Sequence, residues 1–308
     1  MVNYLIRRFF QVLISAFIIV TIVFVAVRLA PGDPAEVMAG QMGTHYTYES
    51  IKSFMGLDRP FHVQYFEYMN GLLKGNLGES VFFYKPVFDM ILYRLPYTLE
   101  LALMVILFTI VIGVPLGIYS AVTINRKTFI NYVLLIFVYS GQATAEFWLG
   151  IVLVFIFSVK LGLLPSFGTG TYLHTILPVA SLTFPLLARV LRFVRTGFLE
   201  IMQEDFIRTA RSKGLTERVI LYKHAFKNMM IPLVTDMGIR FGALLGGAVV
   251  VEAVFKWPGI GSLIVAAVQS RDYPLIQGCI ITYAFLFLFV HLFIDIIYVF
   301  IDPRIHYN

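Results

Sequence analysis

The sequence has few charged residues and only one cysteine. Charged residues make up 14% of the 308 positions and hydrophobic residues 59%, whereas about a quarter of a soluble domain is charged. Because Cys279 is the only cysteine, an intrachain disulfide is excluded, and the cysteine content says nothing about the redox compartment. The composition argues against a soluble domain and favours a chain that crosses a membrane several times.

Motifs that carry common chemistries are absent as well. The sequence has no G-x-x-x-x-G-K-[ST] phosphate loop, no H-E-x-x-H or paired-cysteine zinc pattern and no G-x-S-x-G elbow. Its six histidines are dispersed along the chain, so no metal site is predicted. We therefore expect no catalytic residue, no metal and no bound cofactor in this chain, and nothing in it supports an intramembrane enzyme.

The formal net charge is +6. A basic chain can bind nucleic acid. In a membrane protein, however, basic residues typically mark cytoplasmic loops and contact anionic lipid headgroups. We expect contact with membrane lipid and none with nucleic acid.

Six apolar stretches are long enough to cross a bilayer, which takes about 20 helical residues. They cover approximately Phe9–Ala30, Leu99–Ile124, Phe129–Val159, Tyr172–Gly197, Met229–Ala253 and Leu275–Ile301. The fourth holds Pro178 and Pro185, which kink a membrane helix but are tolerated where neighbouring groups satisfy the freed carbonyls. The expected fold is an all-α polytopic membrane protein with six transmembrane helices.

Basic residues outside these stretches fall on one side of a six-span arrangement. Arg7 and Arg8 precede the first stretch, Arg126 and Lys127 lie between the second and the third, and the basic run 208–227 lies between the fourth and the fifth. Loops rich in Lys and Arg stay in the cytoplasm, so both termini are expected there. The first apolar run is too long for a signal peptide and has no small-x-small cleavage site, so we expect a retained span.

The chain divides into three parts. Residues 1–30 hold the N-terminus and the first span, residues 31–96 form an extracytoplasmic segment, and residues 97–308 form a transmembrane domain with a cytoplasmic loop at 198–228. The extracytoplasmic segment is too small for an enzyme domain. Its sequence predicts two short helices, Tyr48–Met55 and Phe61–Leu73, which fit a cap that an external partner touches.

The cytoplasmic loop predicts two helices joined by a tight turn. Asp205 is a suitable N-cap for the first helix, Gly214 suits its left-handed C-cap position, and Thr216 can cap the second. One side of the first helix is apolar and the other basic, with Phe206, Ile207 and Ala210 against Arg208, Arg211 and Lys213. Such a helix either lies on the membrane surface or docks onto a partner.

The residues of this loop resemble those of a known family. The run Arg208–Gly214, followed by Ile231-Pro232, is similar to the EAA coupling loop of ABC-importer permeases, in the form found in the oligopeptide, dipeptide and nickel branch. Arg208 and Thr209 stand where the general motif has Glu and Ala, which fits this branch, while Ala210 and Gly214 keep the motif. Similar pieces occur in order along the chain at 29–34, 94–101, 251–261, 271–275 and 302–304.

The resemblance implies a type I ABC-importer transmembrane fold in a bacterial or archaeal cytoplasmic membrane. The chain would be a permease subunit that moves peptides, or a related small solute such as glutathione or a nickel chelate, inward by alternating access. Its implied partners are a second, similar permease, two ATPase subunits that bind ATP and Mg²⁺, and an extracytoplasmic solute-binding protein that largely sets the cargo. The residues implied to couple the chain to its ATPases are Asp205, Phe206, Arg208, Thr209, Ala210, Arg211, Lys213 and Gly214.

Ionisable residues at membrane depth are candidates for the transport pathway, because they are unfavourable in hydrocarbon. Asp236 and Arg240, four residues apart, form either a structural ion pair or a part of the pathway. His291 and Asp295 form either a proton relay or a buried hydrogen bond. A self-sufficient proton-coupled secondary transporter that uses these residues is the alternative function, although the absence of a visible internal repeat and the long docking loop argue against it.

Three further pathway or gate candidates are Glu146, Glu252 and Trp257. Glu252 precedes the turn at Trp257-Pro258-Gly259, which is either part of an outer gate or a plain connecting loop. Arginines of the fourth span, Arg189, Arg192 and Arg195, are expected near the lipid headgroups. Gly238, Gly242 and Gly246 form a small-xxx-small stripe, which predicts close helix packing within the subunit or against a second permease.

Overall fold

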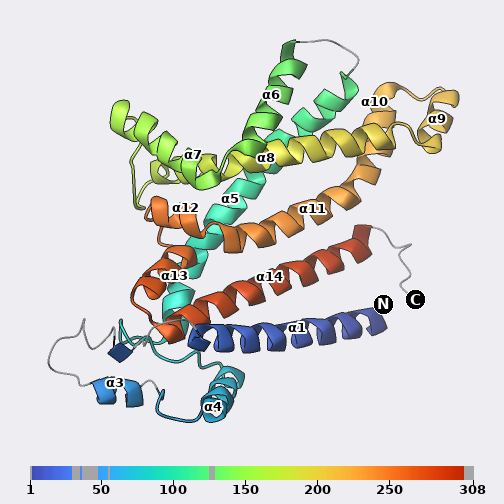
Figure 1. Ribbon diagram of the computed structural model, residues 1–308. Helices are drawn as coiled ribbons and strands as arrows, with labels where there is room; N and C mark the ends of the chain where they lie inside the picture. The colour runs from blue at the N-terminus through green and yellow to red at the C-terminus, as the bar shows by residue number, and fades with distance from the viewer. Residues whose placement is uncertain (1, 30–34, 37–47, 55, 125–128, 302–308) are drawn as a thin grey trace. The chain divides into compact units, whose positions relative to one another are not determined.

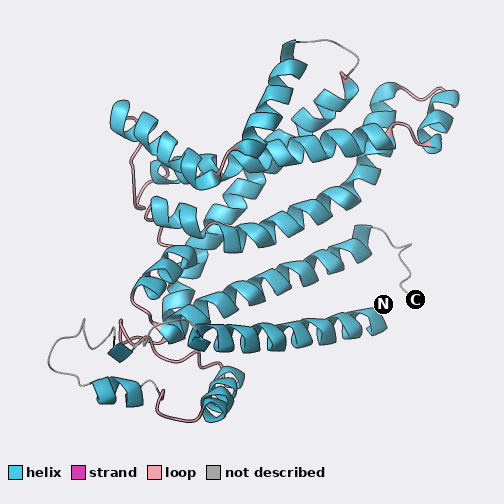
Figure 2. Cartoon of the chain, in the orientation of Figure 1, coloured by secondary structure: helices cyan, strands magenta, loops and turns pink. Residues whose placement is uncertain are grey.

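The computed structural model describes residues 2–29, 35–36, 48–54, 56–124 and 129–301. The regular elements of the described residues are all helices (Figures 1 and 2). They are α1 (Val2–Leu29), α3 (Tyr48–Phe54), α4 (Phe61–Leu73), α5 (Val87–Val122), α6 (Phe129–Ala143), α7 (Glu146–Leu153), the π-helix η1 (Val154–Lys160), α8 (Leu173–Ile201), α9 (Asp205–Ser212), α10 (Glu217–Val219), the π-helix η2 (Ile220–Ala225), α11 (Phe226–Gly247), α12 (Val249–Val254), α13 (Ile260–Gln269) and α14 (Tyr273–Ile301).

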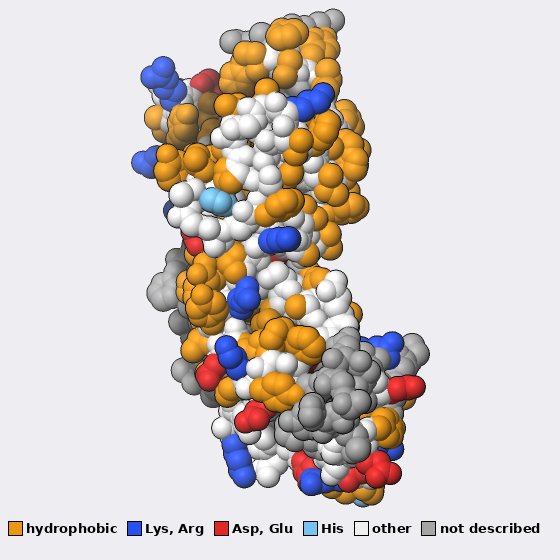
Figure 3. Space-filling model, turned by 90° about the vertical axis from the view of Figure 1, so that its left-hand side faces the viewer, with side chains coloured by type: hydrophobic (Ala, Val, Ile, Leu, Met, Phe, Trp, Pro, Cys, Tyr) orange, Lys and Arg blue, Asp and Glu red, His pale blue; other side chains and the backbone are white. Residues whose placement is uncertain are grey.

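The described helices confirm the all-α class. Five of them are long and apolar enough to cross a membrane, and the number is six if one bent pair counts as a single span. Hydrophobic side chains cover large parts of the surface in Figure 3, as a chain surrounded by hydrocarbon requires. The expected extracytoplasmic helix over 61–73 is confirmed as α4. The other begins at Tyr48 as expected and ends at Phe54, and its expected last residue, Met55, lies outside the described residues.

The second span begins earlier than expected. α5 starts at Val87, twelve residues before Leu99, and runs through Pro96. Val87 and Ile91 are buried in a core cluster formed with α13 and α14. This tertiary packing accompanies a helix that begins within the segment 31–96, which was expected to lie outside the transmembrane domain.

The third span is not one continuous helix. α6 and the helix that starts at Glu146 enclose an angle of 106°, and Ala145 between them is extended. Thr144 donates its hydroxyl to the Ser140 carbonyl at 2.7 Å, a local bond that competes with helix continuation. The expectation of a single helix over 129–159 was wrong.

The fourth and sixth spans are confirmed as α8 and α14, with shifts of four residues or fewer at each end. The fifth differs more. It is continuous with the preceding loop, since the apolar helix runs over Glu217–Gly246, and α12 is a separate short helix rather than its continuation. Two adjacent glycines, Gly246 and Gly247, lower the helix propensity where the long helix ends.

The chain forms two compact units. The first comprises Met1–Leu99, Leu245–Ala253 and Pro258–Phe289. One of its cores joins α5, α13 and α14, and another joins the C-terminal half of α1 to α4 and α14 through Val20, Val23 and Val27. Arg28 of α1 also donates to the Gln64 side chain of α4 at 2.7 Å.

The second unit comprises Glu100–Leu244, Val254–Trp257 and Val290–Asn308. α8 is its central helix and contacts both α6 and α7. A Cβ at Gly141 of α6 would collide with Ala188, and one at Gly117 of α5 would meet Val194 at 2.7 Å. These glycines therefore permit α5 and α6 to approach α8 closely.

Candidate coupling segment and pathway residues

α9 lies in the loop between α8 and α10 (Figure 1). The residues Glu204–Ala225, which comprise α9, α10 and η2, are called the coupling segment below. The N-cap of α9 is Glu204, in an extended conformation, and Asp205 is the first helical residue. The expected N-cap was therefore one residue too late, although the Asp205 carboxylate still lies in the first turn, where the helix dipole favours a negative charge.

Gly214 ends α9 as the sequence predicts. Its φ is +75°, a left-handed conformation that favours glycine. The Gly214 amide donates to the Arg211 carbonyl at 2.9 Å, and the Leu215 amide donates to the Ala210 carbonyl at 3.3 Å. This pair of bonds is a Schellman motif. Thr216 is the N-cap residue of α10, also as expected.

Two side chains hold α9 to the rest of the coupling segment. Ile207 and Ala210 are buried, and α9 contacts η2, whose Ile220 and Ala225 are buried as well. Phe206 was expected on the same apolar side. Instead its side chain is 40% exposed, because it points away from the buried side of α9 that Ile207 and Ala210 form. An exposed aromatic residue on a short helix is suited to contact with a partner.

The polar side of α9 is open to solvent. Arg208 pairs with Asp205 at 3.4 Å, and these side chains are 74% and 95% exposed. Arg211 donates to Glu217 at 2.9 Å. Thr209 and Lys213 are exposed too. Surface ion pairs contribute little stability, so these charges are available to a partner without loss of the fold.

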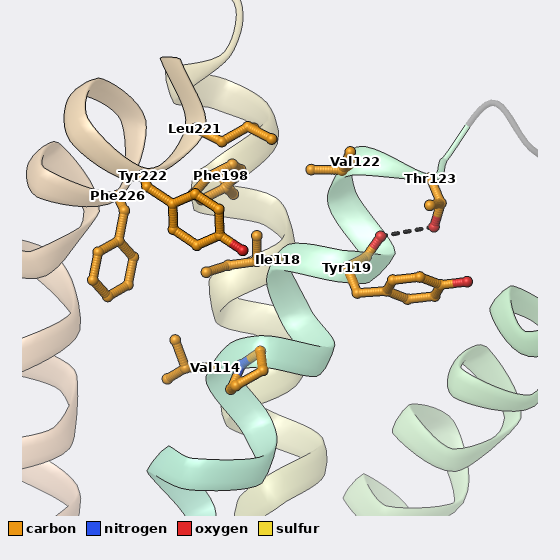
Figure 4. A pocket seen from close by; sticks show the side chains of 10 residues that line it. Val114, Ile118, Tyr119, Val122, Thr123, Phe198, Leu221, Tyr222 and Phe226 are labelled. Atoms are coloured by element: carbon orange, nitrogen blue, oxygen red, sulfur yellow. Dashed lines mark hydrogen bonds between the residues drawn. The ribbon is translucent and has the colours of Figure 1, made fainter. Parts of the chain in front are cut away.

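An apolar cavity of 420 Å³ lies beside the C-terminal end of the coupling segment, where η2 continues into α11 (Figure 4). Tyr222 and Phe226 line it from one side, and Val114 and Ile118 of α5 from another. Phe198 of α8 completes the contact. The coupling segment therefore contacts α5 and α8 beside a cavity that no side chain fills.

The turn between α12 and α13 is organised around a buried carboxylate. Glu252 accepts hydrogen bonds from the Thr98 hydroxyl at 2.8 Å and from the Gly261 and Ser262 amides at 2.7 and 3.2 Å. Thr98 in turn accepts from the Ile260 amide at 2.9 Å. Glu252 and Thr98 thus accept hydrogen bonds from the first three amides of α13, although both residues lie outside this helix. We call these residues the capped elbow.

Two glycines leave the space that the Glu252 carboxylate occupies. A Cβ at Gly259 would collide with the Glu252 carboxylate, and a Cβ at Gly261 would meet Val249 at 2.6 Å. Burial raises the pKa of the Glu252 carboxyl, while the hydrogen bonds and the charge of Arg94 act in the opposite direction. Glu252 thus has a complete structural role at the start of α13.

A second buried carboxylate, Asp272, starts α14. It accepts from the Leu275 amide at 3.2 Å, from the Ser80 hydroxyl, and from the Phe82 amide at 3.2 Å. It therefore fastens the segment before α5 to the start of α14. Sequence reasoning missed this role, although an Asp placed just before Tyr273-Pro274 is a recognisable helix-start signal.

The remaining pathway candidates fall into separate places. Asp236 and Arg240 form an ion pair of 2.6 Å on α11. His291 is half-buried on α14, and the side chain of Asp295 lies outside the described residues. Trp257 is buried.

Glu146 lies at the start of α7, 3.7 Å from Arg189 of α8. Arg192 donates to Gln142 of α6 at 3.0 Å. The arginines of α8 were not expected to meet α6 and α7, because the bend between these two helices has no clear sequence signal.

The predicted glycine stripe of α11 is used in part. A Cβ at Gly238 would collide with Ile294 of α14, so Gly238 permits close packing within the second unit. Gly242 is buried, whereas a Cβ at Gly246 would meet nothing within 4 Å. Among the described residues no group of three or more His, Cys, Asp or Glu side chains is arranged to hold a metal.

Family models match both parts of the chain. Residues 113–307 match the model of binding-protein-dependent transport system inner membrane components, and residues 1–102 match that of the N-terminal region of such components. Curated relatives are similar over the full length of both chains. The glutathione transport system permease protein GsiC of Pectobacterium atrosepticum is 39% identical, and that of Escherichia coli strain K12 is 38% identical.

Solved structures share the fold. The MetNI methionine ABC transporter, in an inward-facing conformation, matches 70% of this chain and 97% of its own with a TM-score of 0.56 and 20% identity. An amino acid ABC transporter with histidines matches 68% of this chain and 92% of its own, with a TM-score of 0.51 and 19% identity. At these identities the likeness concerns the fold alone.

Proposed function

The chain belongs to the family of binding-protein-dependent transport system inner membrane components, and on that premise we propose that it forms half of the membrane pathway of an ABC importer for a small peptide. The permease function expected from the coupling loop is thereby confirmed. We further propose glutathione or a similar short peptide as the cargo, because the full-length relatives are named glutathione transport permeases.

The proposed partners are a second, similar permease, two ATPase subunits that bind ATP and Mg²⁺, and an extracytoplasmic solute-binding protein. The chain itself carries no catalytic residue in this proposal. The basic loops, and with them both termini, would lie in the cytoplasm. Cargo released by the binding protein would pass between the two permeases, and the pathway would open alternately to either side.

The observation that carries the proposal is the construction of α9. This helix presents charged and aromatic side chains outward, while Ile207 and Ala210 hold it to η2. η2 continues directly into α11, so a displacement of α9 is transmitted to a membrane span. We propose that α9 docks in a groove of an ATPase subunit and that ATP-driven closure of the ATPase pair moves α11 through η2.

The experiment is co-purification followed by an uptake assay. The tagged chain is expressed with the genes that neighbour it, extracted in mild detergent and analysed for bound subunits. We expect a second permease and ATPase subunits, and, after reconstitution with the binding protein, ATP-dependent uptake of glutathione. Gly214→Trp, which is strained at φ +75°, should lose the ATPases and the uptake, whereas Gly214→Asn, which tolerates this conformation, should keep them.

Uptake that needs a proton gradient but no ATP, by a chain that purifies alone, would overturn the proposal in favour of the secondary transporter. In that case His291→Gln or Asp295→Asn should abolish uptake. Competition by unlabelled dipeptides and longer peptides in the same assay then defines the range of cargo.

A further inference from the structure

α8 is the most deeply packed of the apolar helices, and its few exposed positions form one stripe. In the half of α8 after Pro185, almost all apolar side chains are buried. Arg189 and Arg192 are exposed and Arg195 is half-buried, and their spacing of three residues places them on one side of the helix. After Pro185 the exposed residues of α8 are Arg189, Arg192, Thr196 and Glu200, so this side of the helix is polar and carries two arginines ahead of one carboxylate.

Arg192 lies far from the first residue of α6. Gln142, which accepts from Arg192, follows Phe129 by 13 residues, about 20 Å along a helix. α6 exposes large apolar side chains from its first residue, since Phe129 is 80% exposed, as a helix in hydrocarbon does. Arg192 itself precedes Ile201, the last residue of α8, by nine residues, about 14 Å along the helix, so it lies within the length of an apolar span.

The stripe has more positive charge than the neighbouring carboxylates balance. Arg189 lies near Glu146, at 3.7 Å, whereas the partner of Arg192 among the described residues is the neutral Gln142. Arg195 forms no hydrogen bond or ion pair with any residue that the structure describes. The Asp236–Arg240 pair of α11 is balanced one to one, so the surplus on α8 is not a general property of the spans.

A cavity adjoins the surplus charge. It has a volume of 270 Å³, and Tyr139, Arg192, Arg195 and Thr196 contribute its polar lining. Beside it, the Nε2 atom of Gln142 is buried and has no hydrogen-bond partner among the described residues. Two guanidinium groups, a phenol and a hydroxyl therefore line one small cavity.

We propose that Arg192 and Arg195 form a binding site for a carboxylate of the cargo inside the aqueous pathway. The inference rests on the proposed function and adds to it the chemistry by which the permease itself holds an anionic peptide. A guanidinium binds a carboxylate through two parallel hydrogen bonds, and charges at membrane depth must face water or a partner rather than lipid. Glu146 partly neutralises the charge of Arg189, so the carboxylate of the cargo would bind at Arg192 and Arg195.

The test uses the complete importer in proteoliposomes, with the variants Arg192→Gln, Arg195→Gln, the double variant and Arg192→Lys. Lys74→Gln, which removes an exposed charge away from the stripe, is the control. We expect the double variant to reduce ATP-dependent glutathione uptake by about tenfold or more, while hydrolysis stimulated by the binding protein is retained. Arg192→Lys should fall in between, because it keeps the charge but not the two parallel bonds.

A binding measurement separates this inference from the proposed function. The purified chain is titrated with millimolar glutathione or its dimethyl ester, and its thermal unfolding is followed. Glutathione should stabilise the wild type and not the double variant, and the ester should stabilise neither. Equal effects of acid and ester, or unchanged uptake in the double variant, would overturn the carboxylate site even if ATP-driven uptake is established.

Anionic lipid is the other source of a negative group. The uptake assay is therefore repeated in vesicles of phosphatidylcholine alone. A defect of the double variant that persists there supports the cargo carboxylate. A defect that disappears would assign the arginines to anionic headgroups and overturn the proposal.

Discussion

The capped elbow and the coupling segment use the same device in opposite settings. Each contains a short helix, α13 and α9, with a carboxylate near its positive end. In the elbow, Glu252 is fully buried and bonded to donors as far as 154 residues away. In the coupling segment, Asp205 is almost completely exposed, and its ion-pair partner lies three residues further along.

The burial of each carboxylate decides whether it acts on its own chain or on a partner. A buried carboxylate with several donors stabilises its own chain, and its removal leaves those donors without partners. An exposed pair contributes little to folding and remains accessible to another molecule. We therefore expect substitutions in the elbow to lower the stability of the chain, and substitutions on the open side of α9 to weaken its binding to the ATPase.

The largest expected effect is that of Glu252→Ala. It leaves the Gly261 and Ser262 amides and the Thr98 hydroxyl without their acceptor, so we expect a loss of about 3 kcal/mol or more. The measurement is the thermal unfolding midpoint in detergent, together with the amount of folded protein in the membrane. Glu200→Ala, at an exposed position of α8, is the control and should leave both unchanged. Equal midpoints for the two variants would contradict the structural role of Glu252.

Gly259→Ala should act on the same site from the opposite side. The added methyl group collides with the Glu252 carboxylate, and overpacking of this kind costs up to about 3 kcal/mol. Gly246→Ala is the matched control, because its Cβ meets nothing within 4 Å. A midpoint that falls for Gly259→Ala and not for Gly246→Ala is the expected result of parallel melts. A lower midpoint for both variants would show that the chain is sensitive to any glycine replacement and would contradict the specific collision with Glu252.

Local chemistry made the coupling segment predictable. The left-handed turn at Gly214 and the N-cap position of Thr216 follow from residues within a few positions of each other, and the structure has both, although the Thr216 side chain forms no capping hydrogen bond. The elbow was not predictable in the same way, because the partner of Glu252 is 154 residues away and no pattern in the sequence connects Thr98 to it. The 106° bend after Ala143 was missed for a related reason, since Thr144-Ala145 contains neither proline nor glycine.

Most of the fold followed from the apolar runs, whose length alone indicates spans. The errors lie at helix ends, where packing decides. α5 begins at Val87 because this end is buried against α13 and α14. The contacts of Arg189 with Glu146 and of Arg192 with Gln142 were not expected, because they depend on a helix bend for which the sequence has no clear signal.

Two adjacent residues of α9 allow the buried and the exposed side of the same helix to be compared. Ile207 is buried and Phe206 is exposed. Ile207→Ala should destabilise the segment by about 2 kcal/mol and increase its cleavage by added protease. Phe206→Ala should leave protease resistance unchanged but reduce ATPase co-purification, because it removes an exposed aromatic contact. Loss of protease resistance in Phe206→Ala would contradict the assignment of the two faces.

The smallest effect on stability is expected for the pair of Arg211 and Glu217, which are bonded at 2.9 Å and both exposed. Exchanging the two residues, Arg211→Glu with Glu217→Arg, keeps the pair, and the pair itself contributes about 0.5 kcal/mol or less. The unfolding midpoint should therefore stay within error of the wild type. ATPase binding should nevertheless fall, because the exchange moves a positive charge from α9 to α10 on a surface where charge complementarity selects the partner. Rescue by raised salt is not expected, since salt weakens the remaining attraction as well. Retention of both stability and ATPase binding in this variant would show that Arg211 serves only its own loop, and the division between inward-acting and outward-acting charges would then apply to the elbow alone.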